Sequence, residues 1–198
     1  MLSRTRPSAH TRQLQSDREQ VLVANPDQVL FVFSLKKPQS NLRKLDRFLV
    51  VAERNELPAA VCVNKIDLGK PGEAQKKFGL YEQLGYPVFY TSAKQNEGIE
   101  AVRDFLTGKL TVVAGSSGVG KSSLLNAVQD GLGLKVNQVS QATGKGLHTT
   151  RYAELIPLEV GGYVADTPGI RGLAIFDIEP DELDGYFREI APLVSDCQ

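Results

Sequence analysis

The glycine-rich stretch near the middle of the chain has residue types and spacing that suit phosphate binding. It reads GSSGVGKS, so Gly115 and Gly120 enclose four residues and are followed by Lys121 and Ser122. Glycines let backbone N–H groups curl around a phosphate, and the positive end of a helix dipole strengthens that attraction. Lys121 would reach the β- and γ-phosphates of a nucleotide, and the Ser122 hydroxyl would ligate Mg²⁺. The stretch predicts a P-loop, the alternative being an ordinary glycine-rich turn.

The predicted phosphate contacts run through this stretch and one residue beyond it. They are Gly115, Ser116, Ser117, Gly118, Val119, Gly120, Lys121, Ser122 and Ser123. Lys121 is also predicted to take part in catalysis, because it would reach both outer phosphates. The loop alone does not name the base, since ATPases, small-molecule kinases and GTPases all use it.

The sequence NKID at residues 64–67 indicates the base. It follows an apolar strand, so it is expected at the carboxyl edge of a sheet, where such folds bind ligands. Asp67 can accept hydrogen bonds from guanine N1–H and the 2-amino group, whereas adenine would leave this carboxylate desolvated and unpaired. Lys65 would pack its stem over the base, and Asn64 would tie this loop to the P-loop. The motif is common by chance and gains weight from its place after a strand.

The sequence TSAK follows the next expected strand and would complete the guanine pocket. Small side chains at Ser92 and Ala93 allow a backbone N–H to approach the guanine 6-oxo group, and Lys94 would cover the base. The motif is weak alone, and its position at the end of the strand after NKID gives it force.

Two later motifs, GLHTTR and DTPG, suit the γ-phosphate and the metal. Asp166 would hold Mg²⁺ through a water molecule, and the Gly169 N–H would contact the γ-phosphate and sense its hydrolysis. Thr150 is the preferred second Mg²⁺ ligand, with Thr149 as the alternate. Alone, each motif could be an ordinary turn or a solvated loop.

Apolar strands alternate with amphipathic helices along most of the chain, which predicts an α/β three-layer sandwich of the P-loop GTPase type with a mainly parallel sheet. Strands are predicted at 28–35, 58–68 (running into a polar loop), 87–93 and 109–115. Helices are predicted at 40–55, 71–84, 97–106, 121–129 and 179–194. A hairpin is predicted over 151–169, with its turn at Gly161-Gly162.

The order of the motifs is unusual, because both base motifs precede the P-loop. Ordinary GTPases run the other way. A parallel sheet tolerates the change, since each loop depends on the position of its own strand and not on chain order. The sequence therefore predicts a circularly permuted GTPase domain.

Composition sets outer limits on what the protein can do. The 198 residues carry 23 Lys+Arg and 23 Asp+Glu, so the net charge of zero gives no sign of a strongly basic nucleic-acid-coating protein. No apolar run is long enough to span a membrane, and the N-terminus lacks the apolar core of a secretory signal. The two cysteines indicate no disulfide framework. We therefore expect a protein without a membrane partner that is cytoplasmic, or in an organellar stroma or matrix if its source is a eukaryote. The expected oligomeric state is a monomer, although composition gives no evidence on this point.

The motif order NKID, SAK, GSSGVGKS, GLHTTR, DTPGIRGL resembles that of the ribosome small-subunit-dependent GTPase A family of circularly permuted GTPases, over roughly residues 20–198. The resemblance implies GTP and GDP as ligands, Mg²⁺ as cofactor, and the 30S subunit with its 16S rRNA as partners. It also implies His148 as the water-positioning catalytic residue, because Ile170 occupies the place where many GTPases carry a glutamine. The alternative for His148 is a solvated loop histidine.

The chain departs from the family pattern at both ends. About 20 polar residues stand where the family has an OB-fold, and Cys197 falls at the first ligand position of the family's zinc domain. One cysteine cannot make a four-ligand site, so Zn²⁺ is expected only with that further domain. The expected divisions are an N-terminal tail over 1–24, the GTPase domain over 25–178 and a C-terminal helix over 179–198, in a core either trimmed or naturally reduced.

The favoured function is GTP hydrolysis as a switch in 30S maturation, in which the ribosome comes from the resemblance alone. Three alternatives stay open. They are a permuted GTPase for large-subunit assembly, a GTP-locked assembly module with little turnover, and an ATP-dependent small-molecule kinase. The last would require the base motifs to be coincidence.

Overall fold

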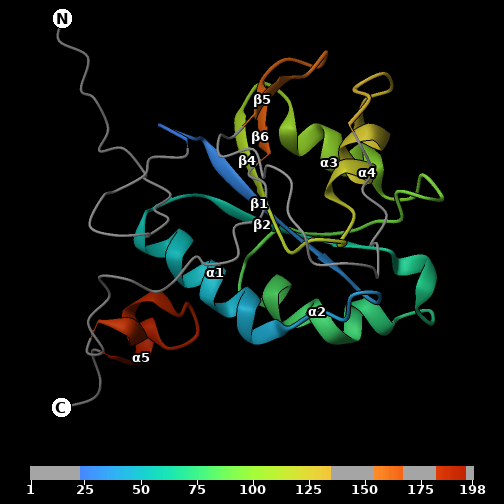
Figure 1. The fold of residues 1–198 in the computed structure, drawn as a ribbon. Helices are drawn as coiled ribbons and strands as arrows, with labels where there is room; N and C mark the ends of the chain where they lie inside the picture. The colour runs from blue at the N-terminus through green and yellow to red at the C-terminus, as the bar shows by residue number, and fades with distance from the viewer. Residues whose placement is uncertain (1–22, 135–153, 167–181, 195–198) are drawn as a thin grey trace, which may run out of the picture.

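The computed structural model describes residues 23–134, 154–166 and 182–194, and these residues form a six-stranded sheet with the order β3-β2-β1-β4-β6-β5 (Figure 1). The strands are β1 (Gln28–Ser34), β2 (Ala59–Asn64), β3 (Val88–Tyr90), β4 (Leu110–Ala114), β5 (Glu154–Pro157) and β6 (Tyr163–Asp166). All neighbours pair in parallel except β5 and β6. The predicted α/β class with a mainly parallel sheet is confirmed.

Helices follow the parallel strands, as the alternating sequence pattern predicts. They are α1 (Leu42–Arg54), α2 (Glu73–Gln83), α3 (Ile99–Leu106) and α4 (Lys121–Val128), with a short 3-10 turn, η1 (Ile66–Leu68), after β2. Up to residue 134 the predicted elements end within a few residues of the observed ones, except that the predicted strand 58–68 stops at Asn64. No helix in the described part of the chain is long and apolar enough to cross a membrane.

The sheet is buried on both faces because helices cover each side (Figure 1). Every residue of β1 is buried, which explains why its sequence QVLFVFS shows no polar alternation. One apolar cluster joins the sheet to α1 and α2, where Phe48 packs its ring 5.2 Å from that of Phe31. A second cluster joins the other face to α3 and α4. Cys62 lies in this second cluster, and burial raises the pKa of its thiol to about 12.

The predicted hairpin is confirmed where the structure describes it. β5 and β6 pair antiparallel, with Ile156 opposite Val164. Gly161 and Gly162 occupy the turn with φ angles of 82° and 89°, a region that disfavours other residues. The hairpin places β6 beside β4, so the end of β6 lies next to the start of the P-loop.

The single C-terminal helix predicted over 179–194 is wrong within residues 182–194. These residues form a 3-10 turn, η2 (Leu183–Tyr186), and a four-residue helix, α5 (Ala191–Val194). Phe187, between them, is extended with φ −95° and ψ 115°. Gly185 weakens a continuous helix, and packing of the following residues against α1 and α2 then decides the local conformation.

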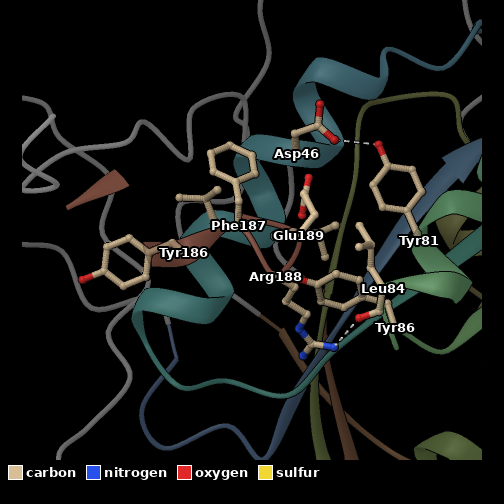
Figure 2. Close-up of a pocket in the computed structure, with 10 residues that line it drawn as sticks. Asp46, Tyr81, Leu84, Tyr86, Tyr186, Phe187, Arg188 and Glu189 are labelled. Carbon is tan, nitrogen blue, oxygen red and sulfur yellow. Dashed lines mark hydrogen bonds between the residues drawn. The ribbon is translucent and has the colours of Figure 1, made fainter. Parts of the chain in front are cut away.

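Side-chain contacts hold this C-terminal segment against α1 and the end of α2 (Figure 2). The Arg188 guanidinium lies 3.8 Å from the centroid of the Tyr86 ring, its Nε is 2.8 Å from Glu53 Oε1, and its Nη1 donates to the Leu84 carbonyl. The Tyr86 hydroxyl donates to the same Glu53 oxygen over 2.9 Å. Arg188 thus joins the C-terminal segment to α1 and to the end of α2.

Candidate nucleotide-binding site

The carboxyl ends of the parallel strands bring the predicted motifs to one edge of the sheet. β2 ends at Asn64, β3 is followed by Thr91 and Ser92, β4 by the P-loop, and β6 ends at Asp166. Parallel register aligns these ends, since Ser34 of β1 lies opposite Asn64. Motifs separated by up to about a hundred residues in the chain therefore meet at one site.

Asn64 links the two halves of this site. Its side chain is 1% exposed, and its Nδ2 donates to the carbonyls of Val119 (3.1 Å) and Gly120 (3.4 Å) in the P-loop. Its Oδ1 accepts from the backbone N–H of Ala93 over 3.2 Å. One buried amide thus sets the spacing between the P-loop and both loops expected to bind the base.

Lys65 adds a second link to the P-loop. It adopts a left-handed backbone conformation, with φ 62°, directly after β2. Its Nζ donates to the carbonyls of Gly118 and Lys37, each at 2.6 Å. Burial lowers the pKa of Lys65, and the nearby Asp67 carboxylate partly offsets this. The ammonium is therefore fixed by two carbonyls, which leaves the aliphatic stem to cover a base.

Asp67 is held by the TSAK loop. Its Oδ1 accepts a hydrogen bond of 2.7 Å from the Ser92 hydroxyl, and Ser92 is fully buried. The Asp67 side chain itself is only partly buried, and Lys94 is exposed. A carboxylate oriented by a buried hydroxyl, with solvent access, is suited to recognising paired N–H donors on a ligand.

The P-loop runs from the end of β4 into α4 with the conformation that its glycines suggest. Gly118 and Gly120 have φ angles of 79° and 97°. A Cβ on Gly115 would overlap with the Val32 carbonyl of β1, so only glycine fits there. Lys121 begins α4, and its Nζ lies 3.0 Å from the Gly115 carbonyl, over the loop itself. Ser122 and Ser123 follow in the first turn of α4, beside the helix's N-terminal dipole.

Two contacts at the site involve residues that lie outside every predicted motif. The Lys37 carbonyl accepts a hydrogen bond from the Lys65 Nζ. The Lys44 Nζ donates a hydrogen bond to the Ser116 hydroxyl over 3.0 Å. Both residues follow β1, which lies between β2 and β4 in the sheet. No motif marks either residue, so these contacts could be predicted only from the order of the strands in the sheet.

The remaining predicted site residues lie beyond what the structure describes. They are His148, Thr149, Thr150, Gly169, Ile170 and Cys197. Asp166 is the last residue of β6 and pairs in register with Val113 of β4, so its backbone lies at the same edge as the P-loop. The roles of Asp166 and of these undescribed residues remain predictions.

Two of the predicted Mg²⁺ ligands, Ser122 and Asp166, belong to elements at this edge of the sheet. Ser122 is the second residue of α4, and Asp166 ends the strand next to β4, so a serine and an aspartate share this edge. No group of three or more His, Cys, Asp or Glu that could hold a metal occurs among the described residues. Mg²⁺ is commonly bound by one or two protein groups together with water and substrate phosphates.

Gly120 offers a direct test of the contact between the two halves. A Cβ on Gly120 would overlap with Asn64 Nδ2, and φ 97° already disfavours any other residue. Gly120→Ala is therefore expected to weaken binding of a guanine nucleotide by about tenfold, because strain and lost hydrogen bonds act together at the P-loop. Titration with a fluorescent GTP analogue measures the effect.

Gly72→Ala is the matched control for this variant. Gly72 also has a positive φ, 75°, but nothing lies within 4 Å of its Cβ position. This variant is expected to lose about 1 kcal/mol of unfolding free energy and to bind nucleotide normally. Equal binding by both variants would show that the Asn64 contact does not matter.

Together, the fold and site define a circularly permuted P-loop nucleotide-binding domain, in which the base loops precede the phosphate loop in the chain. A family profile described as RsgA GTPase matches residues 4–176. The chain belongs to the RsgA GTPase family.

Curated relatives carry the description small ribosomal subunit biogenesis GTPase RsgA. That of Caldanaerobacter subterraneus subsp. tengcongensis is 44% identical over 89% of this chain and 59% of the relative. That of Thermotoga petrophila is 47% identical over 88% of this chain and 61% of the relative. The chain thus spans about 60% of the length of these relatives.

Two solved structures support the same fold. YjeQ from Thermotoga maritima has a TM-score of 0.69 and 44% identity, over 84% of this chain and 56% of that one. YloQ, described as a circularly permuted GTPase, has a TM-score of 0.68 and 34% identity, over 94% of this chain and 64% of that one. The predicted permutation of the GTPase fold is confirmed.

Proposed function

We propose that this chain binds GTP, hydrolyses it to GDP and phosphate, and acts as a switch in maturation of the small ribosomal subunit. The observation that carries the proposal is the Asn64 side chain, which joins a P-loop to a loop containing Asp67. A phosphate-binding loop and a carboxylate able to accept from guanine are thereby held on one sheet edge. The names of the relatives supply the ribosomal context.

The proposal assigns each part of the site a role. Lys121 and the P-loop backbone would bind the β- and γ-phosphates, and Asp67 would bind guanine N1–H and the 2-amino group. Ser122, Asp166 and Thr150 would hold Mg²⁺, which supplies positive charge next to the phosphates when bound. The proposed partners are GTP or GDP and the 30S subunit with its 16S rRNA, and the proposed state is a cytoplasmic monomer.

Turnover measurements distinguish this function from its alternatives. GTP hydrolysis that rises when 30S subunits are added supports the proposal. A rise with 50S subunits alone would favour large-subunit assembly, and GTP binding without turnover under any condition would favour a GTP-locked assembly module. Faster hydrolysis of ATP than of GTP would exclude a guanine-specific switch.

His148 is proposed to position the attacking water, since Ile170 cannot. His148→Ala is expected to lower GTP turnover by about 10- to 50-fold, somewhat less than a full general base contributes, with nucleotide affinity nearly unchanged. Single-turnover hydrolysis and a parallel binding titration measure the two effects. His10→Ala changes the chain's other histidine and serves as the control. Unchanged turnover in His148→Ala would remove this residue from the mechanism.

A further inference from the structure

Lys44 reaches the P-loop from a different element of the fold. It is the third residue of α1, which follows β1, and its Nζ donates to the Ser116 hydroxyl over 3.0 Å. The ammonium also lies 5.3 Å from the centroid of the Phe48 ring, one turn further along the same helix. This cation–π contact helps to hold the ammonium beside Ser116, at the start of the P-loop.

The charge of Lys44 is not neutralised by a neighbouring acid within the described residues, since no ion pair there joins it to a carboxylate. The side chain is partly buried, and this burial alone lowers its pKa. A partly dehydrated cation therefore stands next to the P-loop and adds positive potential there. Such a potential acts on phosphate charge over several ångströms.

The position of Lys44 along the P-loop indicates which phosphate it influences. Asn64, from the guanine side, contacts Val119 and Gly120 near the end of the loop, whereas Lys44 contacts Ser116 at its beginning. A nucleotide held by its base at Asp67 would extend its phosphates away from the guanine loops. Lys44 would then lie toward the terminal phosphate.

We propose that Lys44 is a positioning and specificity-determining residue that favours the nucleoside triphosphate over the diphosphate. It fixes the Ser116 side chain by a hydrogen bond, and its charge attracts the extra negative charge of the terminal phosphate. The inference rests on the proposed GTP binding at this site. It adds a preference between GTP and GDP that depends on α1, outside the nucleotide-binding motifs.

The test compares affinities for GDP and for the β,γ-imido analogue of GTP on the full chain. Lys44→Met keeps an aliphatic stem over Phe48 but removes the charge. This variant is expected to weaken analogue binding by about 5- to 10-fold and GDP binding by less than twofold, and the difference should shrink at high salt. Lys44→Arg should retain the preference for the triphosphate, because arginine keeps the positive charge.

Lys77→Met is the matched control. Lys77 is also a partly buried lysine, with its ammonium 5.9 Å from the centroid of the adjacent Phe78 ring and 3.3 Å from the Ser40 carbonyl, but it does not contact the P-loop. Binding of both nucleotides should be unchanged in it. Ser116→Ala, which removes the same hydrogen bond without altering α1, should reduce the triphosphate preference in part.

The outcomes separate this inference from the function on which it rests. If Lys44→Met weakens GDP and the analogue equally, or behaves as Lys77→Met does, Lys44 has no role in the preference while GTP binding stands. If the wild-type chain binds neither nucleotide, the proposed function and this inference are both overturned. Thermal unfolding of each variant shows that it is folded, and Lys44→Arg and Ser116→Ala decide the question if Lys44→Met is not.

Discussion

Replacing Lys121 with methionine is expected to weaken GTP binding by about 100-fold or more and to abolish measurable turnover. The Lys121 ammonium lies over the P-loop, 3.0 Å from the Gly115 carbonyl, at the first residue of α4. From there it can form charge-assisted hydrogen bonds with two phosphates, each worth roughly 1.5–3 kcal/mol. Methionine has a similar length without the charge, so the loss reports on electrostatics rather than packing. Isothermal titration with the β,γ-imido analogue measures it.

Lys109→Met is the control for a general charge effect. Lys109 precedes β4, at the opposite end of the strand from the P-loop, and its Nζ donates to Gln28 Oε1 over 3.0 Å. Its loss should leave nucleotide affinity unchanged. Normal GTP binding by Lys121→Met would mean that the glycine-rich loop is not the phosphate site.

Replacing Asp67 with asparagine is expected to weaken GTP binding by about 100-fold and to improve binding of xanthosine triphosphate. The carboxylate can accept from both guanine donors, and losing two charge-assisted bonds costs roughly 3 kcal/mol or more. The asparagine amide brings a donor that pairs instead with the 2-oxo group of xanthine. Competition of the two nucleotides against a fluorescent guanine nucleotide measures the change in specificity.

Asp104→Asn removes an exposed carboxylate on α3 and is the control for this variant. It should bind GTP as the wild type does and should not bind xanthosine triphosphate. Retained GTP preference in Asp67→Asn would place guanine recognition at other residues, because the Ser92-held carboxylate would then not touch the base.

The permuted chain order has little effect on the site, because the sheet joins its parts. Asn64 precedes the P-loop by about fifty residues, yet its amide contacts both Val119 and Gly120. Asn64 and the P-loop are close in space because β1 pairs in parallel with both β2 and β4. A site assembled from strand ends depends on neighbouring strands and tolerates a change in which end of the chain comes first.

The C-terminal segment shows where local signals were insufficient. The sequence predicted one helix over 179–194, but Arg188 stacks on Tyr86 (Figure 2). Arg188 also pairs with Glu53, and the chain forms η2 and α5 in place of one helix. The helix signals come from neighbours in the chain, whereas Leu84 and Glu53, which Arg188 contacts, are 104 and 135 residues away. Tertiary contacts therefore overrode a weak local preference.

Patterns in the sequence predicted the strands, most helices and the hairpin turn, and they marked the motifs from Asn64 to Ser123. These predictions depend on apolar periodicity and on glycines at fixed spacing, which are local properties. The position of β1 between β2 and β4 is visible only in the folded sheet. That strand order brings the Lys37 carbonyl to Lys65 and Lys44 to Ser116. Neither contact has a local signature, because each joins residues that only the packing of separate strands makes neighbours.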